Sequence, residues 1–226
     1  MLSGFLFILF GTKLKMATGR PREFDYETAL DAAIETFWQK GYDGCSLSDL
    51  EEAMGINRPS LYAAFGSKEE LFYSAVDQYI EKTGMRLLSS WKLGAEFQSG
   101  FLNFLYEAVS GLFVHGKAKG CLVASVLAEE SCDSAKARAK LMKCLKRMDE
   151  AIVERIEKSP PGCLKKGIDT TSIAQTINAF LHGLSSRARS GESASQLRAL
   201  ARFFHKTMSN IACSAACLKN HNSRQL

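Results

Sequence analysis

The stretch of sequence that decides the fold is residues 46–71, SLSDLEEAMGINRPSLYAAFGSKEEL. Its spacing predicts two short helices joined by a tight turn, followed by the start of a third helix. Ser46 can cap the first helix, because Asp49 stands three residues later and completes a capping-box pattern. Gly55 stands where a glycine commonly ends a helix. We therefore expect the first helix to lie between Ser46 and Gly55.

The second short helix is predicted to begin after Asn57, which can cap it. Pro59 fits its first turn, where the missing N–H costs no helical hydrogen bond. Leu61 and Phe65 lie four residues apart and would pack against the first helix. Helices this short are unstable alone, so other parts of the chain must support them. A helix–turn–helix of this kind has the geometry that places its second helix in a DNA major groove.

The pattern Gly55-Ile56-Asn57, followed by Leu61-Tyr62, Phe65, Lys68 and Leu71, resembles the DNA-binding signature of the tetracycline-repressor (TetR) family. The resemblance covers residues 19–75, and the remainder is similar only in its helical pattern and its length. Glu51 and Ala64 depart from the family pattern, which usually has a small residue and an aromatic residue at these positions. The resemblance implies an all-α fold of about nine helices. An N-terminal three-helix helix–turn–helix DNA-binding domain, here called the reader domain, would precede a helical ligand-binding and dimerisation domain.

The resemblance also implies a function. It predicts a homodimeric repressor that binds a near-palindromic operator in double-stranded DNA and releases it on binding a small effector, with no catalytic residue, cofactor or metal. Groove-facing positions are expected to be Arg58, Ser60, Tyr62 and Ala63, and Pro59 is expected among the DNA-binding residues. Phosphate contacts are expected from Ser46, Tyr62 and Lys68, with helix N-termini assisting.

Composition and charge constrain this reading. Hydrophobic residues make up 46% of the 226-residue chain and charged residues 23%, which is ordinary for a globular protein. The net charge is +5, but residues 16–80 hold five basic residues against twelve acidic ones. DNA binding must therefore depend on a few locally placed cations and not on bulk charge.

The N-terminal region contains a segment unlike the rest of the chain. Residues 1–15, MLSGFLFILFGTKLK, include an apolar run too short to span a bilayer. We expect translation to start at Met16, with a membrane anchor as the minority alternative. Next comes a basic arm in which Arg20 and Arg22 can reach a phosphate or a minor groove; a solvated tail is an equally good interpretation. The reader domain is predicted to span residues 16–67.

The second domain is predicted to span residues 68–218, followed by a disordered tail over 219–226. A long helix from Lys68 towards Trp91 would connect the reader to an aromatic-rich helical region, and residues 121–132 are expected to form a buried helix. This region is mostly core, and it also offers the material for an apolar pocket. The expected pocket lining, which favours an apolar or aromatic effector, is Phe101, Phe104, Leu105, Cys121, Phe180 and His182.

Two long apolar helices near the C-terminus, over 170–188 and 194–212, resemble the pair that dimerises the family as a four-helix bundle. Leu184 and Phe204 are expected at that interface.

The alternative function is a helical sensor in which an electrophile or a metal at cysteine is the signal. The seven cysteines are odd in number and irregularly spaced, which favours reduced thiols in a cytoplasmic protein. Cys121 follows Gly120 at an apparent helix start, near Lys117 and Lys119, and both features lower a thiol pKa; a buried structural cysteine is the more frequent case. A weaker metal candidate consists of His205, Cys213, Cys217 and His221, of which two or three at most could share a helical face.

Overall fold

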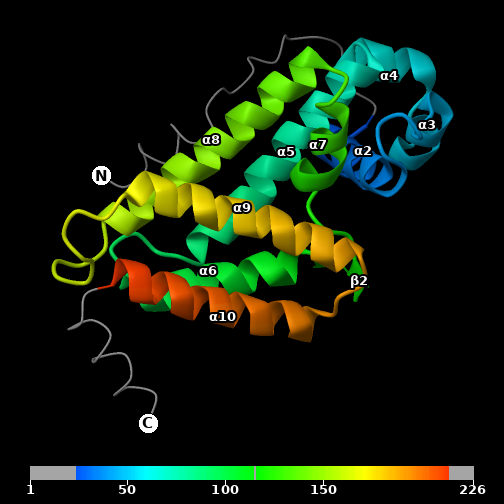
Figure 1. The fold of residues 1–226 in the computed structure, drawn as a ribbon. Coiled ribbons are helices and arrows are strands. Elements are labelled where there is room, and N and C mark those ends of the chain that lie inside the picture. Colours follow the sequence, from blue (N-terminus) through cyan, green and yellow to red (C-terminus); the bar gives the residue numbers. More distant parts are fainter. Residues whose placement is uncertain (1–23, 115, 214–226) are drawn as a thin grey trace. The chain divides into compact units, whose positions relative to one another are not determined.

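The computed structural model describes residues 24–114 and 116–213 (Figure 1). Within these ranges it contains nine α-helices, one π-helical segment and one two-stranded sheet. The all-α fold class is therefore confirmed. The chain forms two compact units, residues 1–82 and 83–226. The predicted extension over 1–15 and the predicted tail over 219–226 lie outside the described residues.

The first unit is made of helices that begin and end at residues suited to those positions. Asp25 caps the first of them by accepting a hydrogen bond from the Thr28 N–H at 2.6 Å, and Gly41, at φ 73°, ends it. The helices, drawn from blue to teal in Figure 1, are α2 (Tyr26–Lys40), α3 (Leu47–Met54), α4 (Arg58–Phe65) and the first part of α5 (Lys68–Ser89).

Aromatic packing between α2 and α5 builds the core of the first unit. The rings of Phe37 and Phe72 meet edge to face, with centroids 5.1 Å apart, and Tyr42 packs on Phe72 at 5.0 Å. Leu50 of α3 and Leu61 of α4 are fully buried. Burial of a leucine side chain is worth about 1.5–3 kcal/mol. The short helices are thus stabilised by tertiary packing and not by their own length.

The second unit contains the end of α5 and the remaining helices. In this unit α10 packs along α6 and α9 packs along α8, as Figure 1 shows. Asp169 caps α9 by accepting from the Ser172 N–H at 3.0 Å, and Ser193 forms a capping box with Gln196 at the start of α10. The helices are α6 (Phe97–Gly111), α7 (Ala128–Glu130), α8 (Ala135–Glu157), α9 (Thr170–Arg189) and α10 (Ala194–Ala212).

The segment after α6 differs from the predicted single helix over residues 121–132. A short hairpin of β1 (Phe113–Val114) and β2 (Lys117–Ala118) follows α6. The π-helical segment η1 (Val123–Leu127) then runs into α7. The N–H of Leu127 bonds the carbonyl of Leu122 at 3.1 Å, five residues back, which widens the turn. The apolar periodicity correctly indicated burial but could not show this change of hydrogen bonding.

A buried arginine holds the end of α5 inside the second unit. Arg155 of α8 donates hydrogen bonds to the carbonyl oxygens of Trp91 at 3.0 Å, Leu88 at 3.2 Å and Ala151 at 2.9 Å. Burial lowers its pKa, and the carbonyl-rich C-terminus of α5 offers the negative end of a helix dipole to the cation. Arg155 thereby fixes the α5 end to α8.

None of the helices in the described ranges is both long enough and apolar enough to cross a membrane.

Candidate nucleic-acid interface

The first helix of the reader motif begins with the predicted capping box. The Asp49 N–H donates to Ser46 Oγ at 3.1 Å, and the Ser46 N–H donates to Asp49 Oδ2 at 2.9 Å. Lys40 Nζ also donates to Asp49 at 2.6 Å, and together these hydrogen bonds lower the pKa of Asp49 to about 2. The cap is therefore ionised under ordinary conditions and connects α3 to the end of α2.

The turn and the second helix also follow the sequence prediction. Gly55 adopts φ 65°, a left-handed conformation that favours glycine. Asn57 accepts a hydrogen bond from the Ser60 N–H at 2.9 Å and starts α4. Leu61 and Phe65 are buried, so the opposite face of α4 is left to solvent.

The exposed face of α4 carries most of the predicted DNA-contacting residues. Tyr62 is 45% exposed, which is unusual for a large aromatic side chain on a well-packed helix. The other exposed positions predicted for DNA contact are Ser46, Arg58, Pro59 and Ala63, while Ser60 and Lys68 are half-buried. The structure thus brings together small, polar and aromatic groups on one accessible helix surface.

Two contacts fix cations near this surface. Lys68, at the start of α5, places its Nζ 4.5 Å from the centre of the Tyr42 ring, a cation–π contact. Arg58 bonds Glu51 of α3, with Nε 3.1 Å from Oε1 and Nη2 3.3 Å from Oε2. The pairing of Arg58 with Glu51 was not predicted from the sequence. Opposite charges seven residues apart across a tight turn were the signal that could have revealed it. Arg20 and Arg22 lie outside the described residues.

The residues predicted to line an effector pocket fall into two groups. Phe101, Phe104 and Leu105 are fully buried in α6. The first two rings pack on the fully buried Trp91, with centroid distances of 5.5 and 5.7 Å. Among the described residues, the indole Nε1 of Trp91 is the one buried side-chain polar atom without a hydrogen-bond partner. These aromatic rings therefore form a filled core that contains one unused donor.

The other predicted pocket residues lie in or beside α9. Phe180 is half-buried and stacks on Phe204 of α10, with centroids 3.8 Å apart. His182 is half-buried, and burial lowers its pKa while the charge of Asp149 opposes that effect. Cys121 is half-buried, and its N–H donates to Ser185 Oγ at 2.8 Å. It precedes a π-helical segment, not the α-helix start that the sequence suggested.

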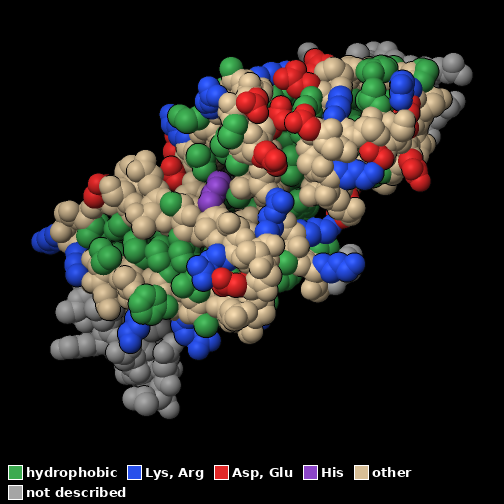
Figure 2. Space-filling view, turned by 45° about the vertical axis from the view of Figure 1, so that its right-hand side comes forward, with side chains coloured by type: hydrophobic (Ala, Val, Ile, Leu, Met, Phe, Trp, Pro, Cys, Tyr) green, Lys and Arg blue, Asp and Glu red, His purple; other side chains and the backbone are tan. Residues whose placement is uncertain are grey.

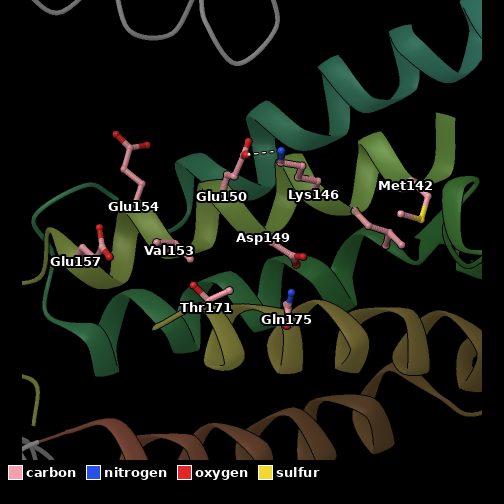
Figure 3. A pocket seen from close by; sticks show the side chains of 10 residues that line it. Met142, Lys146, Asp149, Glu150, Val153, Glu154, Glu157, Thr171 and Gln175 are labelled. Carbon is pink, nitrogen blue, oxygen red and sulfur yellow. Dashed lines mark ion pairs between the residues drawn. The ribbon is translucent and has the colours of Figure 1, made fainter. Parts of the chain in front are cut away.

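The structure also has an open groove of about 690 Å³ between α8 and α9 (Figure 3). Its lining includes Met142, Leu145 and Val153 together with four carboxylates, and none of the predicted effector residues. Each carboxylate already has a partner: Asp149 with Asn178 at 2.7 Å, Glu150 with Lys146 at 3.8 Å, Glu154 with Lys158 at 2.6 Å and Glu157 with Thr170 at 3.2 Å.

Two of the four predicted metal-binding candidates, His205 and Cys213, lie within the described residues. His205 is buried, and its Nε2 lies 2.8 Å from the carbonyl oxygen of Gln98. Cys213 is buried, and Cys217 and His221 lie outside the described residues. Within residues 24–114 and 116–213, no group of three or more His, Cys, Asp or Glu side chains could hold a metal ion.

The capped pair α3–α4, set on α2 and α5 and followed by a helical unit, defines the class of helix–turn–helix regulatory proteins. Residues 29–75 match the family model described as "Bacterial regulatory proteins, tetR family". The chain is 31% identical over 191 residues to the HTH-type transcriptional repressor ComR of Escherichia coli K12, covering 83% of this chain and 90% of ComR. It is 31% identical over 199 residues to the repressor BdcR of the same organism, covering 88% and 96%.

A solved structure shares the fold at a similar level of identity. It is a cysteine mutant of the TetR family transcriptional regulator CifR, complexed with 26-bp double-strand operator DNA. The TM-score is 0.76 at 32% identity, covering 83% of this chain and 98% of that one. The chain therefore belongs to the TetR family, and it is a transcriptional regulator and not an enzyme.

Proposed function

We propose that this protein is a homodimeric repressor that binds a near-palindromic operator in the cytoplasm and releases it on binding a small apolar or aromatic effector. The observation that carries the proposal is the exposed face of α4, with Tyr62 45% exposed on a helix otherwise fixed by buried Leu61 and Phe65. ComR and BdcR are named as transcriptional repressors, and CifR is complexed with operator DNA.

DNA recognition would divide between base and phosphate contacts. Arg58, Ser60, Tyr62 and Ala63 lie on α4, and the first residues of such a helix contact base edges. Ser46 and Lys68 stand at the starts of α3 and α5, where backbone N–H groups favour phosphates. Pro59 would shape the first turn of α4 and pack on the sugar–phosphate backbone.

Dimerisation would use the solvent-facing sides of α9 and α10. Phe203 is 70% exposed and Ile211 is 52% exposed, both on α10. The stacked pair of Phe180 and Phe204 joins the two helices beside them. Figure 2 shows hydrophobic side chains gathered over this part of the second unit. A patch of this kind is typical of an interface with a second copy, and one reader helix alone contacts too few base pairs for useful specificity.

Leu184, by contrast, is 1% exposed and faces the interior of its unit, so the prediction that it lies at the interface is wrong.

The effector would bind in the aromatic core around Trp91, and because that core is filled in this structure, its rings would have to move apart to admit a ligand. The Nε1 of Trp91 could donate to one polar atom of a ligand, while Phe101, Phe104 and Leu105 would contact the apolar body. Phe180, His182 and Cys121 would complete the site on the η1 and α9 side. Helix α5 begins in the first unit and ends in this core. A ligand that prefers another arrangement of α5 would therefore shift the protein towards conformations that do not bind the operator.

The test is operator selection with the full chain. Purified protein is incubated with a random DNA pool, and enriched sequences are checked by gel retardation at several salt concentrations. We expect an enriched near-palindrome whose half-sites lie about one helical turn apart. Failure to enrich any sequence would refute the proposal.

The signal is tested with the same operator. Small molecules that co-purify with the protein are identified by mass spectrometry and added to the bound complex. Release by an apolar or aromatic compound, retained in Cys121→Ser, supports the effector route. Release lost in Cys121→Ser, and elicited by electrophiles only, would replace it with the thiol-sensor alternative.

A further inference from the structure

The guanidinium of Arg58 is held by a residue of the preceding helix. Glu51 accepts from its Nε at 3.1 Å and from its Nη2 at 3.3 Å, and Ser48 Oγ lies 3.4 Å from the same Nη2. The Arg58 side chain is 50% exposed, while the Glu51 side chain is 22% exposed. The more buried carboxylate therefore anchors the more exposed cation, and this contact raises the pKa of Arg58.

The two hydrogen bonds occupy one particular edge of the guanidinium. A guanidinium has a side edge, formed by Nε and one terminal nitrogen, and an end edge, formed by both terminal nitrogens. Glu51 takes the side edge of Arg58. Nη1 makes no hydrogen bond to another described residue, and the contact of Nη2 with Ser48 Oγ is long at 3.4 Å. The end edge therefore keeps its Nη1 donor available, and a ligand acceptor could replace Ser48 at Nη2.

The position of this end edge suits base recognition. Arg58 is the first residue of α4, directly after the Asn57 cap, and the N-terminal residues of a recognition helix contact base edges. Two parallel N–H donors match the O6 and N7 acceptors of guanine in the major groove. Holding the side chain in place before binding also reduces the rotamer entropy lost on contact.

We propose that Glu51 is a specificity-determining positioning residue, which holds Arg58 so that its end edge reads one guanine in each operator half-site. This inference rests on the proposed operator binding. Glu51 has a second effect on specificity, because its carboxylate repels the phosphates of any DNA. The residue thus lowers affinity for random sequences while it strengthens the preference for guanine at one position.

The experiment uses the full chain and the operator obtained by selection. Six proteins are compared: wild type, Glu51→Ala, Glu51→Gln, Arg58→Ala, the Glu51→Ala/Arg58→Ala double variant and the control Glu52→Ala. Glu52→Ala is the matched control, since Glu52 is an exposed neighbour on the same helix with the same charge and makes no side-chain hydrogen bond to Arg58. Each protein is titrated on the operator, on operators with each other base at the guanine position, and on random DNA.

We expect Arg58→Ala to abolish most of the preference for guanine, which a bidentate contact sets at about 5- to 150-fold. Glu51→Ala should reduce the same preference by less than Arg58→Ala does, about two- to tenfold within that range, and strengthen binding to random DNA a few-fold. Glu51→Gln, which keeps the shape and one acceptor, should retain an intermediate preference. The double variant should match Arg58→Ala in base preference, because the effect of Glu51 on base preference passes through Arg58. Glu52→Ala should strengthen random binding without changing base preference.

Two results would overturn the inference. One is a Glu51→Ala protein that changes affinity equally for every sequence, as Glu52→Ala does, because Arg58 would then contact a phosphate. The other is a Glu51→Ala protein with a lowered unfolding temperature and uniformly weaker binding, because Glu51 would then only support the packing of α3 on α4. If the wild type enriches a sequence that Arg58→Ala reads equally well, this inference fails alone; if the wild type enriches none, the proposed function fails with it.

Discussion

Replacing Phe203 by serine tests the assembly proposed for α9 and α10. Its side chain is 70% exposed, so its loss should leave the fold of the second unit intact. A Phe side chain buries about 200 Å² when fully covered, and the exposed share of Phe203 is therefore about 140 Å². At about 25 cal/mol per Å² this corresponds to about 3.5 kcal/mol per protomer, or about 7 kcal/mol for the two symmetric copies.

The figure of about 7 kcal/mol is an upper limit, because association also costs rotational freedom and side-chain ordering. We expect the dimer dissociation constant to rise at least about 100-fold, which is about 2.8 kcal/mol at 1.4 kcal/mol per tenfold. Binding to the full operator should fall with it, while binding to an isolated half-site should not change.

The assay is analytical ultracentrifugation over a range of concentrations, with circular dichroism to confirm the fold. Met142→Ser is the matched control: Met142 is 65% exposed on α8, and its replacement should leave the dimer intact. A Phe203→Ser protein as dimeric as the wild type would refute the assignment. If Met142→Ser alone dissociates the protein, the interface lies on α8.

Three further predictions follow from the same contacts. Lys68→Ala should weaken binding to all DNA sequences alike and reduce the salt slope of log K by about one unit; an unchanged slope would remove Lys68 from the interface. Gly100→Ala should destabilise the second unit by about 1–3 kcal/mol in urea unfolding, because a methyl group there would overlap the Trp91 indole; unchanged stability would mean that the indole moves freely. The pKa of Asp49 lies at about 2, below its ordinary value of 3.8, mainly because Lys40 bonds it. The contribution of the ionised Asp49 to stability is therefore fully present above about pH 4 and is lost as the pH falls through about 2. The difference in unfolding temperature between wild type and Asp49→Asn should shrink over that window, and a difference as large at pH 2 as at pH 7 would contradict this.

Much of the reader unit could be predicted because its signals are local. The capping box of Ser46 and Asp49, the left-handed Gly55 and the Asn57 cap each involve residues three or fewer positions apart. Their backbone requirements hold in almost any surroundings. Such features can be deduced from sequence before any tertiary contact is known.

Helical periodicity predicted less in the second unit. It placed Leu184 and Phe204 together on one dimer face, but Leu184 is 1% exposed and faces the core. Periodicity marks an apolar stripe on a helix and cannot say which part of a wide stripe meets the protein's own core. The π-helical segment at Val123–Leu127 depends on the hydrogen bond from the Leu127 N–H to the Leu122 carbonyl, five residues back. Tertiary packing, and not the apolar pattern, decides between this bond and the ordinary α-helical one.

The sequence by itself determined the helix class, the boundaries of the two reader helices and the family, since these rest on short-range backbone chemistry and on fixed spacing. Only the tertiary structure decided which charges meet. Arg58 is held by Glu51 across the turn, and Arg155 is buried against the carbonyls of Leu88 and Trp91 about 65 residues away. The reason is physical: a cation's partner is chosen by distance and burial in space. Residue order can suggest a partner across a short turn, as for Glu51 and Arg58, but not for groups about 65 residues apart, as for Arg155.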